Sequence, residues 1–304
     1  MLGKVFLREL VATGVIILVA TFAVHALFFF APQDANVAGG GDACYDVGYL
    51  ERDTLGPVGT AALLFTSYGS WLGCVASGSF ANSLYTGEPV RDILNRSLGQ
   101  TMIIMVLGLV FSGLFAVGIG WFAATSRRPW WRMLSAGLGV ASLIPVYLLA
   151  FTLRPLFLGR DGAVGMEPGK LLVMGVLLGI ANGIFAESVE TVGQTINKES
   201  AEPYVRSLIA RRIPVARHIL RSASPVIIGV GASNIPRLVT AVFILEFAFN
   251  VHGIGYQGLQ AFDFTGRCDV PVILAIVLVA VLMTRILLGL QRLAIAWLDP
   301  RHEV

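Results

Sequence analysis

Charged side chains are scarce in this sequence of 304 residues. Asp, Glu, Lys and Arg together make up 13% of the chain, about half of the ~25% found in soluble domains. Hydrophobic residues make up 56%, and the mean hydropathy is +0.76. This composition excludes a disordered chain, a fibrous chain and an ordinary soluble enzyme, and it indicates that lipid is the solvent for much of the surface. A net charge of +3 is too small and too scattered for a nucleic-acid-binding surface.

The sequence also lacks the motifs of common catalytic sites. It contains no HExxH, no GxSxG and no Walker A motif. The Gly-x-Gly motifs at 118–120 and 253–255 are weak nucleotide signals, because the first lies within an apolar run and the second in a turn. The apolar segments hold no pair of acids, and the two halves show no clear repeat, which argues against a self-powered carrier. We therefore expect no catalytic residue and no metal ligand in this chain.

Cysteine is rare, with Cys44, Cys74 and Cys268 as the only three. None forms a CxxC pair or has zinc-like spacing to a histidine. An odd count leaves at least one cysteine unpaired within the chain. A Cys44–Cys268 disulfide on an oxidising side of a membrane and three unpaired thiols are both open, because sequence does not give the geometry of a disulfide.

Six apolar segments are long enough to cross about 30 Å of hydrocarbon. They cover residues 10–30, 99–125, 133–156, 171–186, 226–249 and 270–295, and the fourth is the shortest. The first lacks a clear cleavage site and is interpreted as a retained span rather than a signal peptide. The sequence thus predicts an all-α integral membrane protein with about six transmembrane helices, in a single domain spanning 1–304.

The charges of the connecting segments alternate along the chain. Segment 31–97 carries seven acids and three bases, whereas bases gather at both termini, after the second span and in the loop 187–222. The positive-inside rule makes the basic side cytoplasmic. Both termini are then cytoplasmic and segment 31–97 lies outside. Within that outer segment, the apolar stretch 58–72 is expected to pack against the helix bundle or to lie in the membrane interface.

The few ionisable residues inside the apolar segments are costly there and therefore informative. Arg237 and Glu246 lie nine residues apart, on nearly opposite faces of a helix. Arg237 follows Pro236, which can break the helix. Arg237 is either a pore-lining cation for substrate carboxylates or a structural arginine paired with carbonyl groups or an acid, and Glu246 is either a gating or a structural acid. We expect His25 to be packed or to snorkel rather than to be a ligand, and Arg285 to pair or to snorkel.

The basic loop 187–222 is too long for a simple turn. Within it, residues 204–212 predict a short helix with Val205, Leu208 and Ile209 on one side. A helix of this kind can dock into the groove of a partner protein or lie on anionic lipid. Composition does not decide between these two partners.

Short motifs along nearly the whole chain resemble those of the membrane permease subunits of binding-protein-dependent ABC importers, in the dipeptide/oligopeptide/nickel branch. In the first half they are FAPQD (30–34), YGSWLG (68–73), GSFANSL (78–84) and TGEPV (86–90). In the second half they are YVRS (204–207), RHILR (217–221), EFAF (246–249), GIG (253–255) and LDPR (298–301). Each motif alone is weak, but their order on a six-span frame matches the family.

The resemblance implies the type I importer permease fold in a bacterial inner membrane. It implies a second permease subunit, two cytoplasmic ATPase subunits that bind ATP and Mg, and an external solute-binding protein that delivers a peptide or a related small solute. This chain would itself hold no cofactor. The residues that couple it to the ATPases would be Tyr204, Val205, Arg206, Leu208, Ile209, Arg212 and Arg217.

The chain departs from the family within this coupling segment. The family has A-x-A-x-G between the YVR and RH motifs, whereas Arg212 stands here at the glycine position. The spacing is also shorter by about four residues, roughly one helical turn. Two other functions therefore stay open, a non-transporting scaffold or sensor subunit on the same fold and a carrier driven by an ion gradient.

Overall fold

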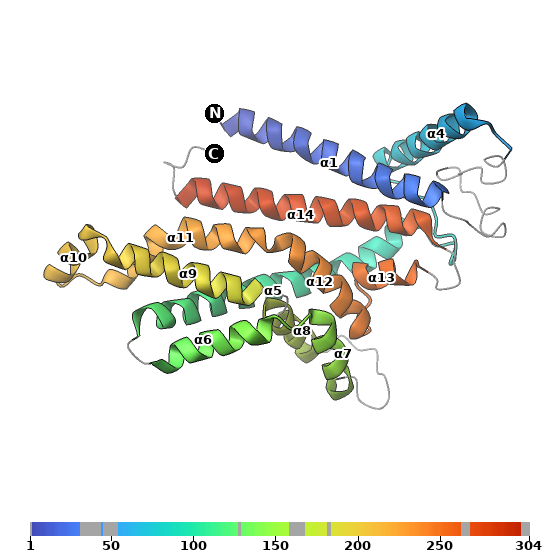
Figure 1. The fold of residues 1–304 in the computed structure, drawn as a ribbon. Coiled ribbons are helices and arrows are strands. Elements are labelled where there is room, and N and C mark those ends of the chain that lie inside the picture. Colours follow the sequence, from blue (N-terminus) through green and yellow to red (C-terminus); the bar gives the residue numbers. More distant parts are fainter. Residues whose placement is uncertain are drawn as a thin grey trace. The chain divides into compact units, whose positions relative to one another are not determined.

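The computed structural model describes residues 2–30, 44, 54–126, 129–157, 168–180, 184–262 and 268–298. These residues are almost entirely helical (Figure 1), and their only strand-like pairs are two isolated bridges, Asn82 with Pro89 and Phe262 with Cys268. The all-α membrane fold predicted from the sequence is confirmed. Residues 31–34 and 299–301, which belong to two of the family motifs, lie outside the described part of the chain.

Contacts divide the chain into two compact units, and each is described by itself. Unit 1 comprises Met1–Thr101 and His252–Arg285, and unit 2 comprises Met102–Val251 and Ile286–Val304. Helices α5 (Val90–Thr125) and α14 (Val270–Leu298) run from one unit into the other.

Within the described residues, four helices are long and apolar enough to cross a membrane. They are α1 (Leu2–Phe30), α4 (Pro57–Ala76), α5 and α14. The pair α11 (Val215–Ser233) and α12 (Ile235–Ala248) passes the same test when taken together, and it is bent by 44° at its break, as in a broken span or a re-entrant loop. The pair is called the bent span below. The other helices are α6 (Pro129–Ser142), α7 (Val146–Phe157), α8 (Pro168–Ile180), α9 (Ile184–Ala201), α10 (Pro203–Ala210) and α13 (Ile254–Gln260).

Two predicted spans differ from the structure. The predicted span 133–156 is wrong as one helix, because α6 ends at Ser142 and α7 begins at Val146, directly after Pro145. Proline has no N–H and disfavours helical backbone at the preceding residue. The span predicted at 171–186 is also too long, since α8 ends at Ile180. The stretch 58–72 belongs to α4, which has the length and apolarity of a span and packs against α1, as one of its two predicted placements expects.

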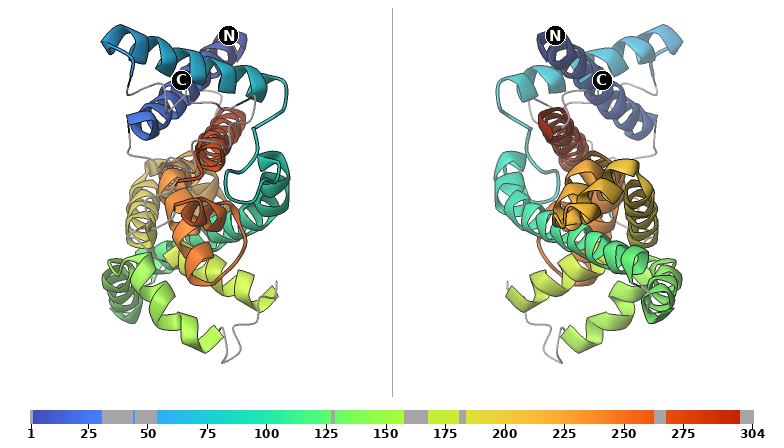
Figure 2. Two further views of the ribbon diagram at one scale, coloured as in Figure 1. Left: turned by 90° about the vertical axis from the view of Figure 1, so that its right-hand side faces the viewer. Right: turned by 90° about the vertical axis from the view of Figure 1, so that its left-hand side faces the viewer.

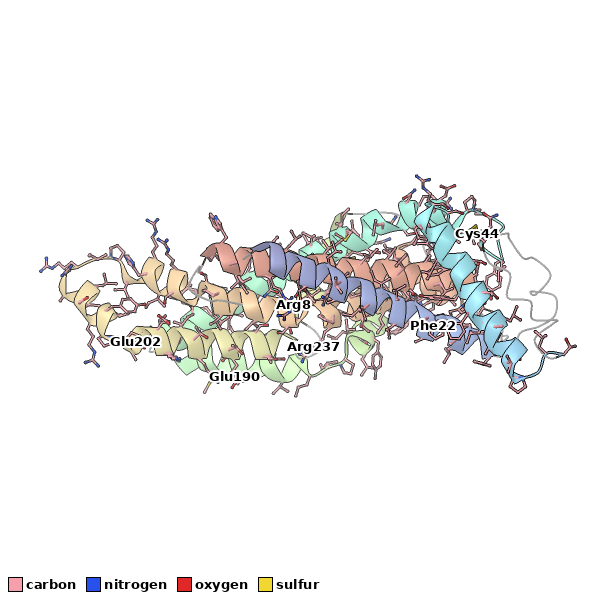
Figure 3. All side chains as sticks on the ribbon, turned by 90° about the horizontal axis from the view of Figure 1, so that it is seen from above. Arg8, Phe22, Cys44, Glu190, Glu202 and Arg237 are labelled. Atoms are coloured by element: carbon pink, nitrogen blue, oxygen red, sulfur yellow. A yellow bond between two sulfur atoms is a disulfide. The ribbon has the colours of Figure 1, made fainter. Side chains whose placement is uncertain are left out.

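In unit 1, α4 crosses α1 (Figure 2), and buried polar side chains join the two helices. The hydroxyl oxygens of Tyr68 and Thr21 lie 2.8 Å apart, and Nε2 of His25 lies 3.0 Å from Oγ of Ser67. The ring of Phe22, labelled in Figure 3, packs edge-on against Tyr68. His25 is fully buried, so its predicted packed role is confirmed. Polar contacts of this kind hold helices together where lipid removes the hydrophobic driving force.

A disulfide in unit 1 joins Cys44 to Cys74, with their Cα atoms 5.7 Å apart. The predicted Cys44–Cys268 disulfide is therefore wrong, and so is the alternative of three unpaired thiols. The two bonded cysteines are only 30 residues apart in sequence, and a short loop costs less entropy to close than one of more than two hundred residues. The disulfide ties Cys44 to the last turn of α4.

An ion pair joins α14 to α1 within unit 1. The guanidinium of Arg285 donates to Oε2 of Glu9 at 3.0 Å and to Oγ1 of Thr13 at 3.1 Å. Both charged side chains are mostly buried, with 17% of Arg285 and 27% of Glu9 exposed. The predicted pairing of Arg285 is confirmed.

Asp269 lies directly before α14 and is 2% exposed. The hydroxyl of Ser83 donates a hydrogen bond to its Oδ2 at 2.5 Å. Burial raises the pKa of the Asp269 carboxyl, and the hydrogen bonds from Ser83 and from backbone N–H groups offset part of that rise. The buried carboxylate thus destabilises the folded state most when it is charged.

In unit 2, α5 and α8 approach closely through small residues. A Cβ added at Gly179 would lie 3.0 Å from the backbone nitrogen of Ser112 and 3.2 Å from the carbonyl oxygen of Gly108. Gly175 faces the same stretch of α5. Each helix therefore carries two small residues four positions apart, the spacing that lets membrane helices pack backbone to backbone.

We expect Gly179→Ala to lower the free energy of unfolding by about 1–3 kcal/mol, because the added methyl group meets backbone atoms that cannot move aside. The measurement is SDS titration of the full chain in mixed micelles. Gly118→Ala in α5 is the control, since a Cβ there meets nothing within 4 Å, and it gains up to ~1 kcal/mol of helix propensity. Equal effects of the two substitutions would contradict the close crossing.

We expect Asp269→Asn to remove a pH dependence of stability. Because the folded pKa of Asp269 is raised, its contribution is most favourable below the ordinary Asp range and is lost as pH rises through the raised pKa. Asn caps a helix about as well as Asp. As pH rises from acidic to neutral, the unfolding free energy of the variant should increase relative to that of the wild type. A difference that stays constant with pH would contradict the prediction.

Candidate functional site

Helices α9, α10 and α11 form a hairpin in unit 2 with the short α10 at its tip (Figure 1). Val205 anchors α10 and is 3% exposed, in a hydrophobic cluster that includes Val192, Ile196 and Ile219. The sequence prediction of a short helix within 204–212 is confirmed, with observed bounds Pro203–Ala210. One apolar side chain therefore fixes the tip helix onto the hairpin.

The rest of α10 is largely exposed. Ile209 lies one turn beyond Val205 on the same face, yet it is 61% exposed, and Tyr204 is 39% exposed. The sequence placed Val205, Leu208 and Ile209 on one apolar side, but of these only Val205 is buried. The tip therefore offers an uncovered apolar side chain on a short segment that also carries the exposed arginines Arg206, Arg211, Arg212 and Arg217.

The hydroxyl of Tyr204 connects α10 to α9. It donates a hydrogen bond to Oε2 of Glu199 at 3.0 Å. Partial burial and the neighbouring Glu199 carboxylate raise the pKa of Tyr204. The phenol therefore stays protonated at physiological pH and remains a donor.

Helix α10 ends in a Schellman turn centred on Arg212. The N–H of Ile213 donates to the carbonyl of Leu208, and the N–H of Arg212 donates to the carbonyl of Ile209, both at 3.0 Å. This turn holds Arg212 at φ 59°, in the left-handed region that usually takes glycine. The departure from glycine noted in the sequence thus has a backbone cost of roughly 1 kcal/mol.

At its other end, α9 is tied to the bent span. Nδ2 of Asn234, the residue between α11 and α12, donates to Oγ of Ser188 at 3.0 Å. One residue earlier on α9, Glu187 accepts a hydrogen bond from Nη1 of Arg237 at 2.6 Å. Ser188 and Asn234 are buried, whereas Glu187 and Arg237 are each 52% exposed. Two consecutive residues of α9 therefore hold the break.

The structure shows the surroundings of the two ionisable residues singled out in the sequence, Arg237 and Glu246. Arg237 pairs with an acid, as its structural interpretation expected, although the side chain is half-exposed (Figure 3). Glu246 is fully buried in α12. The structure does not bring Glu246 to Arg237, in agreement with their helical spacing. Among the residues that the structure describes, no group of three metal-ligating side chains gathers in one place.

Sequence reasoning missed Ser188 and Asn234, because it considered only ionisable residues. A usable signal was present, since Asn234 stands two residues before a proline inside an apolar run. A polar amide at that point is expensive in lipid unless another side chain pairs with it.

We expect Arg212→Gly to raise the free energy of unfolding by about 0.5–1 kcal/mol, because glycine adopts positive φ without steric cost. This net gain already includes the loss that glycine causes by increasing the conformational entropy of the unfolded chain. SDS titration of the full chain measures the change. Arg211→Gly is the matched control, because Arg211 has φ −85° and gains no relief. A loss of stability for Arg212→Gly as large as that of the control would contradict the strain at this turn.

Comparison with known proteins adds a match over the same region. The family model described as "Binding-protein-dependent transport system inner membrane component" matches residues 116–303. That range includes the α9–α11 hairpin and the bent span.

Individual relatives extend the similarity toward the N-terminus. The chain is 27% identical to the probable peptide ABC transporter permease protein y4tP of Sinorhizobium fredii, over 99% of each chain. It is 25% identical to the glutathione transport system permease protein GsiC of Salmonella typhimurium, over 91% of each. It is 23% identical to the metal-staphylopine import system permease protein CntB of Staphylococcus aureus, over 78% of each. Because the family model covers more than half of the sequence, the chain belongs to the inner membrane components of binding-protein-dependent transport systems.

Proposed function

We propose that this chain is a transmembrane subunit of an ATP-driven importer and forms half of the translocation pore. Its family membership supports the importer role. Relatives named for a peptide, for glutathione and for metal-staphylopine support a peptide or a related small solute as the substrate class. The proposed partners are a second permease subunit, two cytoplasmic ATPase subunits and an external solute-binding protein.

The exposed tip of the α9–α11 hairpin is the observation that carries the proposed coupling to the ATPases. Helix α10 is fixed by Val205 and presents Ile209 and Tyr204 beside a group of arginines. This arrangement suits a groove with an apolar floor and an acidic rim. Arg212 supports the same conclusion, because a side chain kept in a costly backbone conformation is often held there for function.

The hairpin also gives a physical route from the tip to the span. Displacement of α10 moves α9 through Val205 and through the Tyr204–Glu199 hydrogen bond. Helix α9 in turn is bonded to both sides of the break in the bent span, at Asn234 and Arg237. A rigid helix with bonded ends transmits a displacement between sites. In this proposal Arg237 ties α9 to α12 rather than binding substrate.

We propose that the protein is a multi-pass inner membrane protein with both termini in the cytoplasm. The concentration of Lys and Arg in loop 187–222 and at the termini supports this orientation. The disulfide between Cys44 and Cys74 agrees with this orientation when α4 packs at the outer face without crossing the membrane, because both cysteines then lie outside, where an oxidising environment lets disulfides persist.

We expect Ile209→Asp to reduce ATP hydrolysis stimulated by the loaded binding protein at least about tenfold, because a charge replaces an apolar side chain in the docked groove, and tenfold corresponds to only 1.4 kcal/mol. The measurement uses the assembled complex in lipid nanodiscs, with subunit recovery quantified. Replacing residues 204–212 with a Gly/Ser linker should abolish stimulation.

Asn197→Asp is the matched control, since it adds the same charge at an exposed position on α9, outside the tip helix α10. It should leave stimulation near the wild-type value. Normal stimulation in an assembled Ile209→Asp complex would remove the coupling role of α10. A chain that supports no ATP-dependent uptake in any reconstitution would instead favour the scaffold function.

A further inference from the structure

A small pocket of about 40 Å³ lies in unit 2 beside the break between α11 and α12. Residues from α5, α9, α11 and α12 form its wall, and most of that wall is apolar. Three polar side chains line it, Ser112, Ser188 and Asn234. The coupling function proposed above makes no use of this pocket.

One polar atom at the pocket lacks a partner. Asn234 is 2% exposed, and its Nδ2 donates to Ser188. Its Oδ1 is buried and accepts no hydrogen bond from the protein. A buried amide oxygen without a donor is strongly destabilising, and in native proteins such atoms are usually satisfied by an ordered water.

The position of Asn234 in the bent span makes a hydrogen-bond donor for this oxygen more necessary. Asn234 stands at the break itself, and Pro236 has no N–H to continue the helical bonding. At membrane depth, interrupted backbone is tolerated only where it is buried in protein or lines a water-filled cavity. The break between α11 and α12 is buried and lies next to a cavity.

We propose that the pocket binds ordered water and that at least one molecule donates a hydrogen bond to Oδ1 of Asn234. About 10–15 Å³ is enough for one water, which needs two to four polar partners. The pocket exceeds that volume, and its three polar side chains supply the partners. A cation is a poorer occupant, because no carboxylate lines the pocket, and Glu187, next to Ser188 on α9, is engaged by Arg237.

This water would make the break adaptable. Water can exchange hydrogen-bond partners as the bend changes, so that Asn234 stays satisfied at more than one angle. The inference rests on the contacts of the break and not on the proposed importer function.

Hydroxyl-radical labelling by X-ray pulses tests the water directly, because radicals formed from bound water oxidise the side chains next to it. The full chain in nanodiscs is the sample. Leu238 lines the pocket, and Leu245 on the same helix does not, while both are 0% exposed. We expect Leu238 to be oxidised several-fold more than Leu245, and Asn234→Leu to bring the two rates together. Equal oxidation in the wild-type chain would overturn the proposal.

A pair of glycine substitutions tests it without altering Asn234. Gly231 lines the pocket and Gly229 does not, and at both positions an added Cβ meets nothing within 4 Å. Both variants gain helix propensity, but only Gly231→Ala displaces bound water. We expect Gly229→Ala to raise the melting temperature and Gly231→Ala to raise it less or to lower it. A larger rise for Gly231→Ala would show a dry pocket and overturn the proposal.

Discussion

A helix that breaks inside a membrane must satisfy its polar groups without bulk water. In unit 2 this constraint positions α9 and, through it, the tip helix α10. The break between α11 and α12 is held by Ser188 and Glu187 of α9. These bonds fix the start of α9, and the hydrophobic cluster around Val205 fixes its far end. The placement of the tip helix thus follows from two anchors, one polar and buried in the span and one apolar at the hairpin.

Three helices of this chain end in the same turn with residues of different cost. Gly78 after α4 has φ 84°, Asn250 after α12 has φ 53°, and Arg212 after α10 has φ 59°. Glycine adopts this conformation freely, asparagine tolerates it, and arginine is strained in it. Among these three turns, only the one at the tip of the hairpin therefore holds a strained residue, and its side chain is exposed. Nothing in the folding of α10 requires an arginine at this position, which is why the proposed coupling function gives Arg212 a role at the docking surface.

The sequence predicted well the features that depend on one segment of the chain. It predicted less well the features that depend on which distant residues pair with each other. Apolar runs located α1, α5 and α14, and Pro236 indicated the break, because length, hydropathy and a missing N–H are properties of one segment. The same reasoning joined α6 to α7, since it gave too little weight to Pro145. It could not choose the partner of Cys44, and it did not foresee Glu187 as the partner of Arg237. Those pairings depend on how distant segments pack, which no periodicity reports.

The half-exposed Glu187–Arg237 pair is compatible with both interpretations of Arg237, the structural arginine and the pore-lining cation. An ion pair with both side chains 52% exposed contributes little to stability in water, so the buried Ser188–Asn234 bond does more to hold the break. Exposed charges at this depth would be costly against lipid tails. In the proposed importer, the face of unit 2 that carries them would therefore border water or another protein chain rather than lipid. In the proposed pore, Arg237 would be bonded to its acid and still belong to the wall that a solute passes.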